Sequence, residues 1–357
     1  MPNVALSHRE RVMLALDHRP TDRIPIAMVC AGINPPAHRM LEEYLIRHRA
    51  ISVEQYLRPL IDIQRIGPSY VGPKLAQDTD IWGVHRSPIS YGEDCYREID
   101  HYPLAQAKTI DDVLAHRWPE PAWFDVSVMP QQVAAANRDG EYCLMISNGN
   151  IFESSWYMRG FERIFVDLID QPELVHAIFE KVTSYLIDHF RAVLTASQGK
   201  IDLVFTADDI GGQNGLLMSL AMWEEHIKPY HVQLNKAIHE FGAKVIYHSD
   251  GAVMEAVPGL MDMGVDILQA LQFDARGMDP GILKDRYGRV LCFEGGISVQ
   301  KTLPFGTPEG VRREVIERIE VLGRNGGYIL GPSHAIQSGT PPENIAAMFD
   351  TAAGHRS

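Results

Sequence analysis

The sequence has few cysteines, and none lie close enough together to suggest a shared role. The four are scattered along the 357 residues, at Cys30, Cys95, Cys143 and Cys292, without any C-x-x-C spacing. A disulfide framework and a zinc ribbon both need a recognisable cysteine spacing, so neither is predicted. We therefore expect a reduced, cytoplasmic protein.

Long apolar runs and an excess of positive charge are also missing. No stretch of 18 apolar residues occurs, and the opening residues, MPNVALSHRERVML, contain no apolar signal core. Lysine and arginine number 33 against 46 for aspartate and glutamate, giving a formal net charge of -13. These absences argue against a membrane span, and against nucleic acid or an anionic membrane as the main partner.

Glycine-rich phosphate-binding motifs are the third absence. No G-x-G-x-x-G follows the first predicted strand and no P-loop occurs, which disfavours a nucleotide-binding doubly wound sheet. What is present is the composition of an ordinary globular enzyme, with 45% hydrophobic and 22% charged residues. The length suits one α/β barrel with additions, and we take residues 1–357 as a single domain.

From residue 142 onward, strand and helix patterns alternate, which predicts βαβ units around a parallel sheet and hence a (β/α)8 TIM barrel with an N-terminal helical extension. Seven strands are recognised and the eighth is not located. The predicted strands cover residues 23–29, 142–147, 203–206, 244–248, 266–270, 290–293 and 328–330. The predicted helices cover residues 7–18, 38–66, 172–196, 221–241, 252–263, 279–287, 308–322 and a stretch from 342.

Residues 67–140 do not follow this alternation. They are rich in proline, glycine and tyrosine, with a hairpin-like stretch at 81–97. No linker-like composition flanks them, so we interpret them as an insertion or lid within the single domain. The sequence does not decide whether this segment closes over the site.

Polar side chains gather where the predicted strands end, which is where barrels of this type place their active sites. The strand 244–248 ends at His248, and Asp250 lies two residues on, where side chains share a face. Turns alone would supply Gly, Asn and Asp, but not His, Glu and Gln, so a polar pocket is favoured. The other polar residues at strand ends are Asn148, Asn150, Glu153, Asp208, Asp209, Gln213, Gln269, Gln272, Glu294, Ser333 and His334.

Two chemistries fit these residues. In the first, His248, Asp250 and His334 bind zinc or another divalent metal and leave a position open for substrate. In the second, which is metal-free, Asp208 and Asp209 move protons on a nitrogen-rich ligand. The candidates for substrate binding are Asn148, Asn150, Glu153, Gln213 and Gln272.

Structural explanations compete with these roles. His248 could be a satisfied histidine near the core, with Asp250 capping a helix. Adjacent residues on a strand point apart, so one of Asp208 and Asp209 could face the pocket while the other caps the next helix.

Two further sets of residues have competing explanations. Glu294 could pair with an arginine such as Arg324. Trp82, Trp156 and Trp223 could line an aromatic site or pack in the core.

Several stretches, spread nearly end to end, match one known family in order and spacing. They are Arg11–Leu16 with Asp22–Pro25, Thr79–Gly83, Ala207–Gln213, His248–Gly251, Gly295–Ile297, and Gly326–His334 with Pro342–Ile345. In these stretches the chain resembles the uroporphyrinogen decarboxylase superfamily. That superfamily has the barrel fold and includes the decarboxylase of haem synthesis. It also includes cobalamin-dependent methyltransferases acting on coenzyme M, methanol, methylamines, chloromethane and aryl methyl ethers.

The chain departs from the decarboxylase pattern after the first strand. There the decarboxylase carries arginines that bind substrate carboxylates, but residues 28–34 read MVCAGIN, without arginine. A tetrapyrrole with eight carboxylates needs cationic partners, so this departure counts against haem synthesis. Arginines reaching the barrel mouth from residues 60–100 would restore the decarboxylase interpretation.

The chain also departs from the thiol-directed methyltransferases, whose zinc site resembles His-x-Cys plus a later Cys. His248 matches the histidine, Asp250 stands at the first cysteine, and His334 lies close to the second. The harder ligands disfavour thiolate activation but remain compatible with a Lewis acid acting on an ether or alcohol oxygen.

The resemblance implies transfer of a methyl group from a small donor, a methoxylated aromatic or a methylamine, to cob(I)alamin. No D-x-H-x-x-G corrinoid-binding stretch occurs, so a separate corrinoid protein would carry the cobalamin. Asp208, Asp209 or Glu294 would protonate the leaving heteroatom. The alternatives are a decarboxylase using Asp208 or Asp209 and a non-enzymatic tetrapyrrole-binding protein. A homodimer is common in the family, and the sequence leaves the oligomeric state open.

Overall fold

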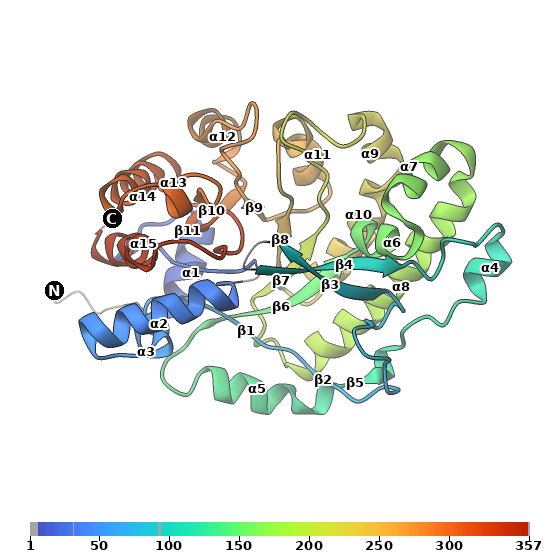
Figure 1. Ribbon diagram of the computed structural model, residues 1–357, viewed down its shortest axis with the longest axis horizontal. Coiled ribbons are helices and arrows are strands. Elements are labelled where there is room, and N and C mark those ends of the chain that lie inside the picture. The colour runs from blue at the N-terminus through green and yellow to red at the C-terminus, as the bar shows by residue number, and fades with distance from the viewer. Residues whose placement is uncertain (1–5, 31, 92–93, 356–357) are drawn as a thin grey trace.

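A curled parallel sheet of seven strands forms the centre of the computed structural model, which describes residues 6–30, 32–91 and 94–355 (Figure 1). The order across the sheet follows the order along the chain, β1-β6-β7-β8-β9-β10-β11, and all neighbours are parallel. The strands are β1 (Ile63–Arg65), β6 (Cys143–Asn150), β7 (Leu203–Ala207), β8 (Lys244–His248), β9 (Ile267–Ala270), β10 (Cys292–Ile297) and β11 (Tyr328–Pro332).

The segment around Ile26 fills the eighth position of the barrel. Ile26 forms a parallel bridge with Leu330 of β11, and its carbonyl oxygen accepts a hydrogen bond of 2.8 Å from the backbone nitrogen of Asp62, next to β1. One residue thus joins the first and last strands of the sheet. The predicted (β/α)8 barrel is confirmed, with one of its eight positions held by a bridge.

The predicted helix over residues 38–66 is wrong beyond residue 57. The chain forms α2 (Pro35–Arg49) and α3 (Val53–Leu57) and then enters β1, the strand that the sequence did not reveal. Three residues are too few to show a strand period, and β1 exists through its pairing with Cys143–Met145 of β6. The predicted strand 23–29 shrinks to the bridge at Ile26, where Pro25 has no N–H to offer a ladder.

Helices cover the outside of the sheet (Figure 1). The predicted helix 221–241 is two helices, because Pro229 starts a new one. The helices of the barrel wall are α6 (Phe152–Arg159), α7 (Phe161–Asp170), α8 (Pro172–Ala196), α9 (Leu220–His226), α10 (Lys228–His239), α11 (Val257–Asp262), α12 (Pro280–Tyr287), α13 (Thr302–Phe305), α14 (Pro308–Leu322) and α15 (Pro342–Gly354).

The helix α1 (His8–Leu16) closes the amino-terminal end of the barrel. Its residues Val12 and Leu16 join the small inner core, whose other members include alternate strand residues such as Met145 and Ile246. The carbonyl oxygen of Ala15 accepts the N–H of Gly327, just before β11. With this end filled, ligands can reach the barrel interior from the opposite end, where the strands terminate.

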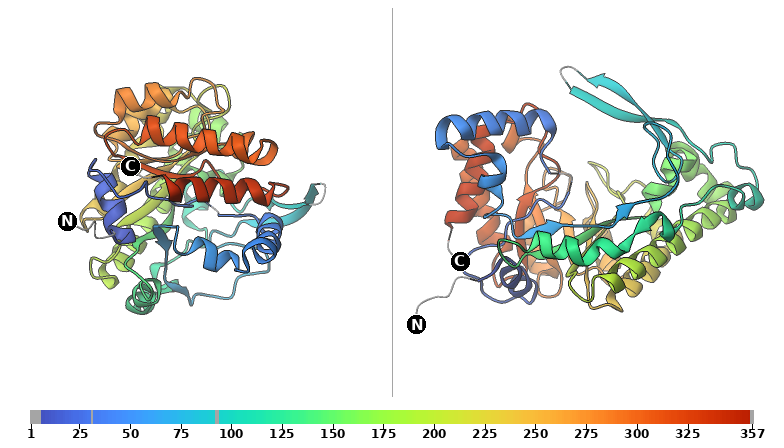
Figure 2. Two further views of the ribbon diagram at one scale, coloured as in Figure 1. Left: turned by 90° about the vertical axis from the view of Figure 1, so that its left-hand side faces the viewer. Right: turned by 90° about the horizontal axis from the view of Figure 1, so that it is seen from below.

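The segment between β1 and β6 contains β2 (Ser69–Tyr70), β3 (His85–Tyr91), β4 (Asp94–His101), α4 (Ile110–Leu114), β5 (Phe124–Asp125) and α5 (Met129–Ala136). β3 and β4 form an antiparallel hairpin outside the main sheet, and Figure 2 shows it standing away from the barrel. The predicted hairpin at 81–97 therefore exists but is shifted toward 85–101. None of the helices in the described part of the chain combines the length and apolar composition needed to cross a membrane.

Candidate active site

A cavity of about 760 Å³ opens at the carboxyl ends of the strands. β8 delivers His248 to it, and the turn after β8 adds Asp250. β7 ends at Ala207 and is followed by Asp209, while β11 is followed by Ser333 and His334. The strand-end rule thus places these side chains in one cavity, as the sequence predicts.

A bulge in β6 brings two successive residues into the cavity. The register of β6 against β7 shifts between Ile146 and Gly149, and Asn148 has a positive φ of 87°. Regular alternation would send Ser147 and Asn148 to opposite faces, but both line the cavity. Asparagine tolerates this left-handed conformation better than most residues.

The structure separates the predicted site residues into two groups. Eight of them line the cavity, namely Asn148, Asn150, Glu153, Asp209, His248, Asp250, Gln272 and His334. Asp208, Gln213 and Glu294 do not. Gln213 is exposed, and its backbone carbonyl accepts the N–H of Arg276.

Asp208 caps a helix. Its carboxylate, completely buried, accepts the backbone N–H groups of Phe152 at 2.9 Å and Glu153 at 2.8 Å, and it contacts Nε2 of His231 at 2.5 Å. The sequence left open which of Asp208 and Asp209 would face the pocket and which would cap the next helix. Asp209 faces the cavity, and Asp208 caps α6, which precedes it in the chain, and not the next helix.

Glu294 lies behind the cavity, on β10. It is completely buried, and burial raises its pKa well above the ordinary value, although the side chain of Gln269 opposes the shift. The suggested ion pair with Arg324 is wrong, because Arg324 pairs with Asp285. The strand register instead places Glu294 beside Gln269 of β9, and Gln269 beside His248.

Gln269 fixes the orientation of His248. Its Oε1 accepts a short hydrogen bond from Nδ1 of the imidazole. An amide oxygen can only accept, so Nδ1 carries a proton, and in the neutral imidazole the lone pair is therefore on Nε2. This Nε2 lies 3.5 Å from Oδ1 of Asp209.

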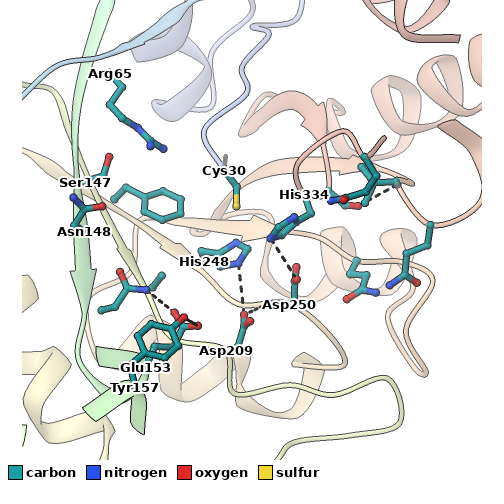
Figure 3. A pocket seen from close by; sticks show the side chains of 18 of the residues that line it. Cys30, Arg65, Ser147, Asn148, Glu153, Tyr157, Asp209, His248, Asp250 and His334 are labelled. Carbon is teal, nitrogen blue, oxygen red and sulfur yellow. Dashed lines mark hydrogen bonds and ion pairs between the residues drawn. The ribbon is translucent and has the colours of Figure 1, made fainter. Parts of the chain in front are cut away.

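Two groups of side chains have the composition and spacing of a metal site, and they share His248 (Figure 3). Cys30, His248 and His334 form one, and Asp209, His248 and Asp250 form the other, with ligand atoms within 4.8 Å of one another in each. The predicted trio of His248, Asp250 and His334 is thus divided between them. Sulfur and imidazole nitrogen are ligands that zinc prefers, so the group containing Cys30 fits that ion.

Burial and the surrounding carboxylates shape the protonation of this region. Burial, with Asp250 and Glu294 nearby, raises the pKa of the Cys30 thiol to about 12. Burial raises the pKa of Asp250 and lowers the pKa of His334. Nε2 of His334 lies 3.8 Å from Oδ2 of Asp250, and the attraction between the two groups acts against both shifts. The thiol is therefore neutral without a cation, and a bound divalent metal would favour its thiolate form.

Glu153 is the carboxyl in the cavity that holds a proton at neutral pH. Burial, followed by the charges of Asp209 and Asp208, raises its pKa to about 8. The hydroxyl of Tyr157, one helical turn along α6, donates to it at 3.0 Å, and the Asn150 amide also contacts it. A protonated carboxyl near pH 7 is a suitable general acid.

Cys30, Arg65 and Tyr157 were missed by the sequence reasoning. Cys30 directly follows the predicted strand 23–29, so the rule applied to the other strand ends would have found it. Arg65 ends β1, the strand that was not recognised. It meets the condition set for the decarboxylase interpretation, since it comes from residues 60–100 and reaches the cavity. It is, however, the single lysine or arginine in the described lining.

This fold and cavity define an α/β-barrel enzyme with its site at the carboxyl ends of the strands. The sequence model of uroporphyrinogen decarboxylase (URO-D) matches residues 133–355, and the chain belongs to that family. It is 26% identical over 196 residues to a uroporphyrinogen decarboxylase from Anaeromyxobacter sp., a match that covers 54% of this chain and 51% of that protein. It is 21% identical over 365 residues to one from Coxiella burnetii, a match that covers 96% of this chain and 93% of that protein.

A solved structure described as a methyltransferase from Methanosarcina mazei shares the fold. The two superpose with a TM-score of 0.67 over 98% of each chain, at 18% sequence identity. At this sequence identity the likeness shows a shared fold and does not show a shared reaction.

Proposed function

We propose that the protein is a metal-dependent methyltransferase that moves a methyl group from a small methylated donor to cob(I)alamin on a separate corrinoid protein. The observation that carries the proposal is the convergence of Cys30, His248 and His334 in one cavity. A decarboxylase that relies on carboxylates and arginines has no need of such a group. The family resemblance and the Methanosarcina mazei fold are consistent with this branch.

Cys30, His248 and His334 would hold the metal, for which zinc is the best candidate. The bond to Gln269 places the proton of the neutral His248 imidazole on Nδ1, which leaves Nε2 as the atom that would bind the metal. When bound, the metal supplies Lewis acidity toward the heteroatom that bears the methyl group. Asp250 contacts His334 from the side and adds negative charge beside the group.

Glu153 would act as the general acid. In the transfer, the bond between the methyl carbon and its oxygen or nitrogen breaks, and the methyl carbon bonds to Co(I), which contributes the electron pair. The leaving heteroatom keeps the electrons of the broken bond and takes the proton that Glu153 holds. This assigns to Glu153 the role that the sequence gave to Asp208, Asp209 or Glu294, because Asp208 and Glu294 lie outside the cavity and the pKa of Glu153, inside it, is raised to about 8.

A decarboxylase acting on a substrate with few carboxylates is the second candidate, and Arg65 is the observation that favours it. One arginine does not match the eight carboxylates of uroporphyrinogen. Haem synthesis is therefore the less supported form of this candidate.

The test is elemental analysis of the purified protein, followed by a transfer assay. We expect about one zinc per chain in the wild type, loss of zinc in His248→Ala and Cys30→Ala, and retention in Asp250→Ala. With candidate donors and a corrinoid protein, the wild type should produce the absorbance of methylcobalamin. Zinc-free wild type, or zinc unaffected by His248→Ala, would contradict the metal-dependent reaction and favour the decarboxylase.

A further inference from the structure

Arg65 is a cation without an anionic partner. It forms no ion pair with any described carboxylate, and its one hydrogen bond goes to the backbone carbonyl of Val29. Burial lowers its pKa, which shows that the surroundings do not compensate the charge. A guanidinium has five N–H donors, so most of them remain available.

Arg65 lies between two cavities. A second cavity of about 460 Å³ shares Arg65, Ser147 and Asn148 with the first, so the two adjoin at these residues. The lining of the second cavity contains no aspartate or glutamate in the described part of the chain. Its wall is largely aromatic and aliphatic, with Trp82 and Tyr185 packed edge to face. Nothing on this side neutralises the guanidinium.

Two polar side chains line the cavity together with Arg65, and one of them lacks a partner. Oγ of Ser147 is buried without a hydrogen-bond partner among the described residues. Asn148 is held next to it by the bulge of β6, and both side chains lie on the same side of the cavity as Arg65 (Figure 3). A guanidinium, a hydroxyl and an amide together suit a carboxylate, which accepts from each of them.

The carboxyls of the large cavity, by contrast, have partners. Oδ1 of Asp209 accepts the N–H of Asp250 at 2.7 Å, Asp250 faces His334, and Glu153 is bonded to Tyr157 and Asn150. These groups lie on the opposite side from Arg65 (Figure 3). Arg65 is therefore the charged side chain of the described lining that has neither an ion pair nor a hydrogen bond to another side chain, and an anionic group on the donor would supply that partner.

An aromatic surface connects the two sides. Arg65 lies over the ring of Phe205 with Cζ 5.9 Å from its centroid, and the Phe205 ring stacks on His248 with centroids 5.8 Å apart. Together these distances place Arg65 and His248 at most about 12 Å apart. A single benzene ring with a carboxylate and a methoxy group spans such a gap.

We propose that the methyl donor is a methoxylated arenecarboxylate whose carboxylate binds Arg65, Ser147 and Asn148 and whose ring lies over Phe205. The methoxy group then lies toward Glu153 and His248. This inference rests on the proposed methyltransferase function and narrows its donor from two classes to one.

The test is calorimetric titration with 3-methoxybenzoate as probe, and with neutral methoxybenzene and trimethylammonium for comparison. We expect 3-methoxybenzoate to bind the wild type and to bind Arg65→Gln about 10- to 100-fold more weakly, because a charge-assisted hydrogen-bonded pair is lost. Arg65→Lys should fall between them. Arg191→Gln, on the exposed surface of α8 where Arg191 pairs with Glu240, should bind like the wild type.

Equal binding of 3-methoxybenzoate to the wild type and Arg65→Gln would overturn the proposal, as would binding of trimethylammonium in preference to it. Arg65→Lys decides the matter if Arg65→Gln does not fold. Binding as expected but without methyl transfer to cob(I)alamin would support the anion site and count against the methyltransferase. Methyl transfer from a methylamine that does not depend on Arg65 would support the methyltransferase and count against the anion site.

Discussion

Burial and two neighbouring aspartates hold a proton on the carboxyl of Glu153. The folded state raises its pKa from 4.5 to about 8, so the folded protein binds this proton more tightly than the unfolded chain does. The stability contributed by the proton is complete below about pH 4.5 and is lost as the pH rises toward 8.

Replacing Glu153 with Gln removes this dependence. The free energy of unfolding of Glu153→Gln relative to the wild type should rise by about 1.4 kcal/mol per pH unit between roughly pH 4.5 and 8. Urea unfolding of both proteins at several pH values measures it. Glu162→Gln, an exposed change on α7, is the control and should follow the wild type. Parallel curves for Glu153→Gln and the wild type would mean that Glu153 is already ionised.

Gln269 acts on the metal group through His248, without belonging to it. Gln269→Leu leaves Nδ1 of His248 without its acceptor, so either imidazole tautomer can form. We expect zinc affinity to fall by about 10- to 100-fold, as measured by competition with a chromogenic chelator. Gln233→Leu, on the exposed face of α10, should bind zinc like the wild type. Unchanged affinity in Gln269→Leu would place the metal elsewhere.

At the scale of elements, α6 depends on Asp208. This carboxylate accepts the first free N–H groups of the helix and contacts His231, so it fixes the part of α6 that carries Glu153. The same carboxylate raises the pKa of Glu153. Asp208 thereby links the position of the proposed acid to its protonation.

Asp208→Ala should lower the free energy of unfolding by about 3–5 kcal/mol, because it leaves a buried imidazole and two N–H groups unpaired. Zinc content should be retained, since Asp208 is not in the metal group. Chemical denaturation and elemental analysis on the same preparation measure both. Asp170→Ala, an exposed change on α7, is the control. Loss of zinc at unchanged stability would reverse the assignment and make Asp208 a ligand.

At the scale of the whole molecule, Asp62 holds the barrel closed. It is completely buried and accepts hydrogen bonds from His8, Arg11, Arg23 and the backbone of Ile26. Burial alone would raise its pKa, but the bonds from His8 and Arg23 outweigh that and leave the pKa below its ordinary value. The charged carboxylate thus ties α1 and the eighth barrel position to β1.

Asp62→Ala should cost about 3–5 kcal/mol of unfolding free energy, because Arg23 loses its carboxylate partner and Arg11 keeps only Asp22. Because Cys30 lies four residues after Ile26, zinc affinity should fall as well. Asp17→Ala, at the exposed end of α1, should change neither quantity. Thermal unfolding measures the stability, and competition with a chelator measures the zinc affinity. An Asp62→Ala protein with wild-type stability would show that closure of the barrel relies on hydrophobic contacts alone.

The sequence by itself determined the barrel and much of the cavity. Regular alternation of apolar strands and amphipathic helices predicts parallel βαβ units, and a parallel sheet brings the ends of its strands together. This was enough to gather His248, Asp250, His334 and Asp209 without any contact information.

Only the tertiary structure decided which residues act together. β1 is too short to show a period and exists through its pairing with β6, so Arg65 could not be placed from sequence. Cys30 joins His248 and His334 because the closing segment brings it across the barrel. Burial separated Glu294 and Asp208 from the cavity and left the proton on Glu153. The distances between side chains across the barrel, and the exclusion of water from buried groups, are set by packing among strands that are far apart in the sequence. The order of residues along any one strand carries little information about either.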